Sequence, residues 1–138
     1  MQQGIIEKNH MDILWHDYAL NKEDTIPITK AGLIEKASVV GRCGMMLLSC
    51  GTGAWRVRSS MNTLSRELGI SCTADIGLMS IEYTCFDGEN CFSQSLCLTN
   101  TGVNTSKLNR LENFINDFPT KEKYLSGEQI HSYLDEIE

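Results

Sequence analysis

The sequence predicts an α+β fold: an αα-hairpin, then a small antiparallel sheet of about three strands, then two C-terminal helices packed on one face. Two observations predict this order. Apolar residues recur every three or four positions before Ile70 and after Ser106, but every second position between them, and these are the periods of helices and strands. Helices that flank a run of antiparallel strands are typical of packed α and β layers.

Residues 1–28 differ from the rest of the chain and are interpreted as an N-terminal arm that can hold one short helix. The polar second half of this arm ends at Pro27, and proline disfavours helix in the residue before it. The compact domain is therefore predicted to span residues 29–138.

The first helix is predicted to begin after Thr29, whose side chain can accept a hydrogen bond from a free backbone N–H. It is predicted to end at Gly51, because glycine readily takes the left-handed conformation that follows a helix. Gly41 and Gly44 each cost about 1 kcal/mol relative to alanine inside a helix, and we expect them to permit close approach of another backbone. The apolar stripe of this helix comprises Leu33, Ala37, Val40, Gly44 and Leu47.

The second helix has Thr52 as its predicted N-cap and ends at Gly69. Because so few residues join the two helices, they should pack side by side as a hairpin. The strands follow, with a hairpin turn predicted at Asp87–Asn90. Their alternating residues are Ile70, Cys72 and Ala74, then Met79, Ile81, Tyr83 and Cys85, then Phe92, Leu96 and Leu98.

Two C-terminal helices complete the predicted fold. The first begins at Ser106 and is closed by Pro119, and the second begins with the capping box Ser126–Gln129. The amphipathic pattern of the second helix continues to Glu138, the last residue. We expect from this pattern that the chain is part of a longer protein.

Charge and hydropathy exclude some classes of function. Twelve basic and eighteen acidic side chains give a formal charge of −6, and residues 111–138 carry two of the basic and seven of the acidic ones. This excess disfavours binding to a phosphate backbone, so nucleic acid is not an expected partner. The longest apolar run, Cys43–Leu48, is far shorter than the ~20 residues of a membrane-spanning helix.

The six cysteines do not predict a disulfide framework. They form no C-x-x-C pair, and the chain does not begin with the basic and apolar regions of a signal peptide. We therefore expect buried, reduced thiols and a cytoplasmic setting. The cysteines are Cys43, Cys50, Cys72, Cys85, Cys91 and Cys97.

No metal ligand, cofactor or catalytic residue is predicted. His10 and His16 are six residues apart and do not share a helical face, and no phosphate-binding glycine loop is present. His131 is the one histidine of the predicted domain. The alternative of a hydrolase-like enzyme that acts on a small amino-acid-derived substrate therefore requires a serine or cysteine beside His131.

The segment around the glycine turn is the candidate ligand-binding site. Gly51, Thr52 and Gly53 lead into a helix whose first turn carries Trp55 and Arg56. Free backbone N–H groups at a helix start and a nearby guanidinium can hold a carboxylate. The simpler, structural interpretation is that Trp55 packs in the core and that Arg56 caps carbonyl groups or pairs with an acidic residue such as Glu82 or Asp75.

Two motifs resemble those of the threonine/serine exporter family. The first runs from Gly41-Arg42 through Leu47–Gly51 to Ala54–Val57, and the second is Thr101–Asn104 followed by Lys107-Leu108. The sequence departs from the usual family pattern at positions such as Ser49 and Trp55, where glutamate and tyrosine are common. The motif residues that we interpret as structural are Gly41, Arg42, Gly44, Gly102 and Asn104.

The resemblance implies the cytoplasmic N-terminal domain of an exporter of threonine, serine or a dicarboxylate. Its partner would be a transmembrane part, either in the same protein or as a separate subunit, and it would lie at the cytoplasmic face of the cell membrane. We expect a regulatory, substrate-sensing or assembly role. A pure oligomerisation scaffold, in which the domain forms homo-oligomers, is a further alternative.

Overall fold

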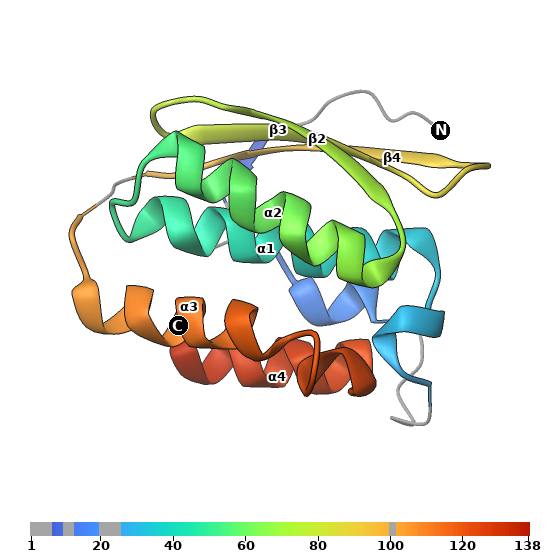
Figure 1. Ribbon diagram of the computed structural model, residues 1–138. Coiled ribbons are helices and arrows are strands. Elements are labelled where there is room, and N and C mark those ends of the chain that lie inside the picture. Colours follow the sequence, from blue (N-terminus) through green and yellow to red (C-terminus); the bar gives the residue numbers. More distant parts are fainter. Residues whose placement is uncertain (1–6, 10–12, 20–25, 100–101) are drawn as a thin grey trace.

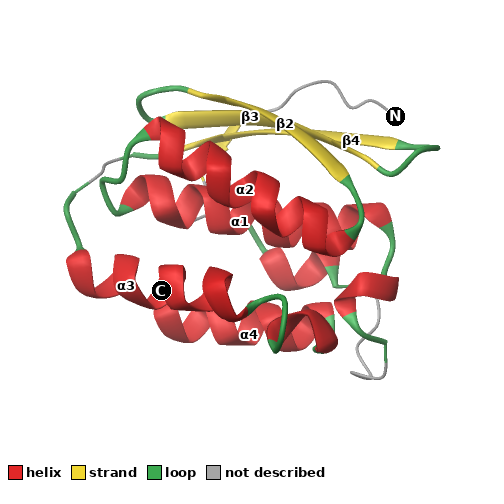
Figure 2. Ribbon diagram, in the orientation of Figure 1, coloured by secondary structure: helices red, strands yellow, loops and turns green. Residues whose placement is uncertain are grey.

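The computed structural model describes residues 7–9, 13–19, 26–99 and 102–138, and these form an α+β fold (Figure 2). The predicted order of two helices, three antiparallel strands and two helices is confirmed. The helices are α1 (Leu33–Ser49), α2 (Ala54–Leu68), α3 (Thr105–Asp117) and α4 (Gly127–Ile137). The strands are β1 (Glu7–Asn9), β2 (Ser71–Ile76), β3 (Ser80–Phe86) and β4 (Cys91–Cys97). Short 3-10 turns are η2 (Trp15–Tyr18), η3 (Ile28–Lys30) and η4 (Glu122–Tyr124).

The elements stack in three layers (Figure 1). The sheet, with strand order β1-β4-β3-β2, forms one outer layer. Helices α1 and α2 lie against it, and α3 and α4 lie beneath those two helices. All four helices are therefore on the same side of the sheet, and α1 contacts the sheet, α2, α3 and α4.

Helix α1 is surrounded by protein over most of its length. Every residue from Ala37 to Leu48 is buried, and apart from Ser38 and Arg42 none of them is polar, as expected of a helix inside the protein. Gly41 lies under the ring and hydroxyl of Tyr83 on β3, and a Cβ at Gly44 would come within 2.6 Å of the Met61 sulfur. The expectation that these glycines admit another backbone is thus wrong, because side chains fill the space.

The antiparallel hairpin of β3 and β4 forms as its sequence predicts. Ile81, Tyr83 and Cys85 alternate toward the helices and are buried. At the turn, the Asp87 carboxylate accepts hydrogen bonds from the N–H groups of Glu89 (2.9 Å) and Asn90 (2.8 Å). These bonds lower the pKa of Asp87 below its ordinary value and hold the turn closed.

The helix ends were predicted more accurately than the helix starts. Gly51 and Gly69 have the positive φ values (+89° and +76°) expected after α1 and α2, and the capping box at Ser126 is present. The N-caps predicted at Thr29 and Thr52 are wrong, since glycines 32 and 53 occupy those positions. Thr29 lies instead in η3, where the fully buried neighbour Ile28 donates its N–H to the Leu125 carbonyl (2.7 Å).

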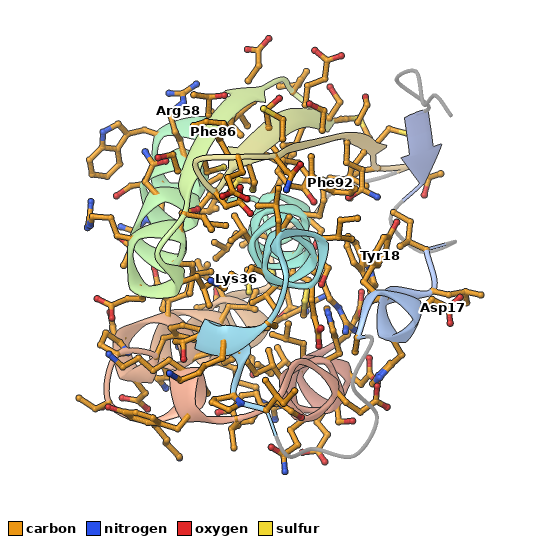
Figure 3. The ribbon with its side chains drawn as sticks, turned by 90° about the vertical axis from the view of Figure 1, so that its right-hand side faces the viewer. Asp17, Tyr18, Lys36, Arg58, Phe86 and Phe92 are labelled. Atoms are coloured by element: carbon orange, nitrogen blue, oxygen red, sulfur yellow. The ribbon has the colours of Figure 1, made fainter. Side chains whose placement is uncertain are left out.

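The described part of the predicted arm packs against the rest of the chain. Strand β1 pairs in parallel with β4, a pairing that the sequence does not predict. Trp15 in η2 is 5% exposed. The Tyr18 ring packs edge-on against Phe92, and its hydroxyl accepts a hydrogen bond from Gln94 (3.1 Å) (Figure 3). The 3-10 turn η2 therefore lies beside α1, on the side away from α2.

All six cysteines are free thiols, and half of them are buried. Cys43, Cys50 and Cys85 lie in the core, as expected for small apolar side chains. Burial raises the pKa of the Cys43 thiol to about 12. The expectation of burial is wrong for Cys91, which is exposed at the start of β4.

Replacing Gly41 tests the packing of α1 under Tyr83. We expect Gly41→Ala to lower the free energy of unfolding by about 2 kcal/mol, because the new methyl group overlaps the Tyr83 ring. The change is measured by urea denaturation. Gly32→Ala is the matched control, since a Cβ there meets no atom within 4 Å. Equal stability of the two variants would contradict this packing.

Candidate functional site

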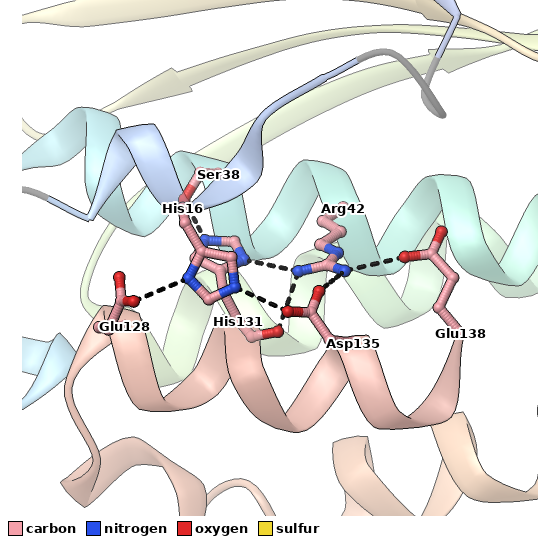
Figure 4. Close-up of polar contacts among 7 residues, drawn as sticks. All are labelled: His16, Ser38, Arg42, Glu128, His131, Asp135 and Glu138. Carbon is pink, nitrogen blue, oxygen red and sulfur yellow. Dashed lines mark hydrogen bonds and ion pairs between the residues drawn. The ribbon is translucent and has the colours of Figure 1, made fainter.

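A network of polar side chains joins α1, α4 and the arm (Figure 4). Ser38 and Arg42 are four residues apart on α1, and His131 and Asp135 are four residues apart on α4. Because residues at this spacing share one face of a helix, the two pairs meet where the helices pack. All four side chains would be costly in an apolar core without partners.

Arg42 is the centre of this network, and its side chain is 3% exposed. Its Nη1 donates to His131 Nδ1 and to the His131 carbonyl oxygen, both at 3.1 Å. Its Nη2 donates to Asp135 Oδ1 at 2.5 Å and to Glu138 Oε1 at 2.8 Å. Two carboxylates from the end of α4 thus neutralise a charge that lies on a buried helix.

These contacts determine the protonation of His131, which is fully buried. Arg42 can only donate, so Nδ1 must carry the lone pair and Nε2 the proton. Burial, and then the Arg42 charge, lower the pKa of His131 to about 3. His131 is therefore neutral at physiological pH.

The contact between His131 and Ser38 is the arrangement that a hydrolase alternative requires, since Oγ and Nε2 are 2.9 Å apart. The protons, however, are placed in the opposite way from those of a nucleophile and its general base, where the hydroxyl donates to the imidazole nitrogen. Ser38 donates its own proton to the Glu35 carbonyl at 2.6 Å, and Nε2 donates to Ser38. In this state His131 has no lone pair directed at the hydroxyl, so it cannot accept the Ser38 proton.

His16 connects the arm to α4. Its ring nitrogens lie 3.0 Å from Glu128 Oε2 and 2.7 Å from Asp135 Oδ2. Burial lowers the pKa of His16, but the hydrogen bonds and charges of these two carboxylates outweigh it and raise the pKa above its ordinary value. A pocket of about 330 Å³ adjoins this contact, lined by Ile13, Leu14, Trp15, His16, Asp17, Arg42, Asp135 and Glu138.

A second pocket, a groove of about 390 Å³, lies between α2 and α3 and contains Arg56, the predicted ligand-binding arginine. Arg56 pairs with Glu112 of α3, and the two side chains are 52% and 31% exposed. Arg56 thus pairs with an acidic residue, as the structural interpretation expects, but the suggested partners Glu82 and Asp75 are wrong. Trp55 is 75% exposed, so its expected place in the core is wrong as well. The groove is lined by Trp55, Arg56, Ser59, Ser60, Thr63, Glu112, Ile115 and Asn116.

The two sequence motifs meet at the glycine turn. The N–H of Gly102 donates to the Ser49 carbonyl (3.4 Å), and the N–H of Asn104 donates to the Cys50 carbonyl (3.3 Å). Asn104 also caps α3, because its side chain accepts a hydrogen bond from the Lys107 N–H. Gly51 and Gly53, with Thr52 between them, thus lie between the end of α1 and the start of α3, beside the groove but not among its lining residues.

Sequence reasoning missed the partners of these arginines. Glu112 and Asp135 are two of the seven acidic residues in 111–138, so nothing local distinguishes them. One signal was available for the buried network: Ser38 and Arg42 are the polar residues, one turn apart, in the otherwise apolar part of α1.

The described part of the chain contains neither a candidate metal site nor a candidate membrane span. No group of three or more His, Cys, Asp or Glu within 7–9, 13–19, 26–99 and 102–138 could hold a metal ion. In the same ranges, none of the helices combines the length and the apolar character needed to cross a bilayer.

Comparison with known proteins identifies the family. The sequence profile of ThrE, described as "Putative threonine/serine exporter", matches residues 38–138, which is more than half of the chain. The chain belongs to the ThrE family. The match covers both motifs, so the resemblance inferred from them is confirmed. ThrE is a family of transporters, which favours a role other than catalysis and implies a membrane-associated protein.

The other two comparisons add no relatives to this ThrE chain. No curated protein matches its sequence. No solved structure matches its fold.

Replacing Arg42 tests whether its charge holds α4 to α1. We expect Arg42→Met, which keeps the length and removes the charge, to lower the free energy of unfolding by about 2 to 3 kcal/mol, because Asp135 and Glu138 lose their contacts with the guanidinium. This expected loss of stability is smaller than the loss from breaking a fully buried ion pair, since Asp135 is half-exposed. Urea denaturation measures the change. Arg110→Met, at an exposed position of α3, is the matched control, and equal midpoints would refute the assignment.

The pH dependence of stability tests the neutral state of His131. The unfolded chain takes up a proton near pH 6.5, whereas the folded chain does so only near pH 3. Stability should therefore fall as the pH is lowered below 6.5, by up to about 1.4 kcal/mol per pH unit. His16 acts in the opposite sense, because its raised pKa stabilises the fold below pH 6.5 and this gain is lost as the pH rises through the raised value.

The matched variant is His131→Asn, whose side-chain oxygen can still accept from Arg42. We expect a smaller decrease in stability between pH 6 and pH 4 than in the unchanged protein, measured by urea denaturation at each pH. An equally steep decrease would show that other groups cause it.

Proposed function

We propose that this ThrE chain is the cytoplasmic part of a threonine/serine exporter and that it senses substrate in the groove between α2 and α3. One observation supports this most directly. Arg56 and Glu112 present opposite charges on the two walls of the groove, and both remain accessible. An amino acid carries the same two charges, a carboxylate and an ammonium group, both attached to its α-carbon.

The charges of the groove suggest how an amino acid would be oriented. Its carboxylate would bind Arg56, which lies in the first turn of α2 near free backbone N–H groups and the positive end of the helix dipole. Its ammonium group would bind Glu112. A ligand that supplies both charges would replace the ion pair without leaving either side chain uncompensated.

The remaining lining residues suit a small, polar side chain. Ser59, Ser60 and Thr63 project from α2, and Asn116 projects from α3. Their hydroxyl and amide groups can bond with a substrate hydroxyl, and Trp55 forms an apolar wall at one end. At about 390 Å³ the groove is within the usual size range of small-molecule sites.

Titration calorimetry of the purified chain with threonine, serine and succinate tests this proposal. We expect saturable binding of the two amino acids and a loss of at least about tenfold in affinity in Arg56→Ala, because a charge-assisted hydrogen bond is removed. Arg110→Ala, which removes the same charge from an exposed position on α3, should bind as the unchanged protein does.

Glu112→Gln separates the two halves of the recognition. It should weaken binding of threonine and serine, which lose a partner for the ammonium group. It should not weaken binding of succinate, which has no ammonium group. Absence of heat with all three ligands from a folded chain would refute substrate sensing and leave Arg56 a structural role.

A further inference from the structure

One end of the molecule carries the three most exposed large apolar side chains in the described part of the chain. Leu78 is 91% exposed, Val103 is 86% exposed and Trp55 is 75% exposed. They come from three separate segments: the turn between β2 and β3, the segment that leads into α3, and the first turn of α2. In Figure 1 these segments all lie at the left-hand end.

Hydrogen bonds between backbone groups hold these segments together. The Leu98 N–H donates to the Met79 carbonyl (2.8 Å), which places the end of β4 beside the turn that bears Leu78. The bonds from Gly102 and Asn104 to the end of α1 place Val103 beside the glycine turn. A Cβ at Gly51 would lie 3.4 Å from Val103 Cγ2. The exposed positions are therefore supported by a rigid framework.

The start of α2 is connected to the same end of the sheet. Arg58 donates from Nε to the Ala74 carbonyl of β2 at 3.3 Å, two residues before the strand ends. Helix α2 packs along β2, so its first turn, which bears Trp55, lies near the turn that follows β2. Three apolar side chains thus project from one end of a single packed unit.

Basic residues accompany these side chains, although the whole chain is acidic. Residues 49–60, 77–80 and 102–110 contain no acidic residue, while the chain has a formal charge of −6. The acidic groups nearest in sequence are Asp75, Glu82 and Glu112, and Glu112 is paired with Arg56. The basic residues of these three segments are Arg56, Arg58, Lys107 and Arg110.

We propose that this end docks reversibly on an anionic phospholipid surface, with Leu78, Val103 and Trp55 entering the boundary between headgroups and acyl chains. Separate apolar residues at turns, an exposed tryptophan and neighbouring Lys and Arg side chains are the features that suit this interface. The docking does not require that the groove binds amino acids.

Charge favours a lipid surface over a second copy of the chain. A symmetric dimer through this end would bring the same patch of each copy together, and the basic residues would then face one another. Like charges across an interface are unfavourable. An anionic bilayer supplies the opposite charge and also accepts apolar residues that project from separate turns.

Vesicle binding of the chain tests the proposal. Vesicles of phosphatidylcholine and phosphatidylglycerol in equal parts should sediment the protein, and vesicles of phosphatidylcholine alone should sediment much less. The emission of Trp55 should shift to shorter wavelength on binding. Trp15 is already buried, so Trp55→Phe should abolish the shift. Added salt should weaken binding, because it screens the basic residues.

The decisive variant is Leu78→Ser combined with Val103→Ser, which alters no residue that lines the groove. We expect at least about a tenfold loss of vesicle binding, since two apolar side chains no longer leave water. The control is Ile34→Ser with Tyr124→Ser, which removes exposed apolar groups at the start of α1 and in η4. It should bind as the unchanged protein does.

Three results would overturn the docking proposal. The first is the absence of binding to the anionic vesicles. The second is equal binding by the double variant and its control. The third is self-association in analytical ultracentrifugation that the double variant abolishes, which would make this end an interface between copies. Amino-acid binding by the double variant is measured in parallel, so that failure of docking and failure of substrate sensing are distinguishable.

Discussion

A buried positive charge on the central helix is the constraint on which the packing of this protein depends. Helix α1 is covered by the sheet on one side and by the other helices on the rest, yet it carries Arg42. An arginine in that position requires acidic partners and acceptors for its N–H groups. Asp135 and Glu138 supply the charge and His131 supplies two acceptors, which determines how α4 lies along α1.

The same constraint positions the features that we connect with function. Once α4 and α3 are held beneath α1, Glu112 lies across from Arg56 and closes the groove between α2 and α3. The backbone bonds between the end of α1 and the segment before α3 then place Val103 near the start of α2. The groove and the basic, apolar end are therefore adjacent features of one framework and share Trp55.

Much of the fold could be predicted from the sequence because its causes are local. The change of apolar period separated helices from strands, and the turn at Asp87 and the capping box at Ser126 depend on neighbouring residues. The N-cap predicted at Thr29 failed for a reason that is not local. Burial of Ile28 against η4 holds the chain in a 3-10 turn there, and packing outweighs one capping bond.

For the candidate sites too, local features could be predicted from the sequence and long-range contacts could not. By itself the sequence determined the family, the element order and the unusual composition of the segment from Gly51 to Arg56. Motifs and apolar periods depend on residues that are neighbours along the chain. Only the tertiary structure decided that Trp55 is exposed, that Arg56 faces Glu112 and that Arg42 is neutralised by the end of α4. Arg56 is 56 residues from Glu112, and Arg42 is 93 residues from Asp135. No periodicity along the chain encodes which distant acidic residue a buried or half-buried charge will contact.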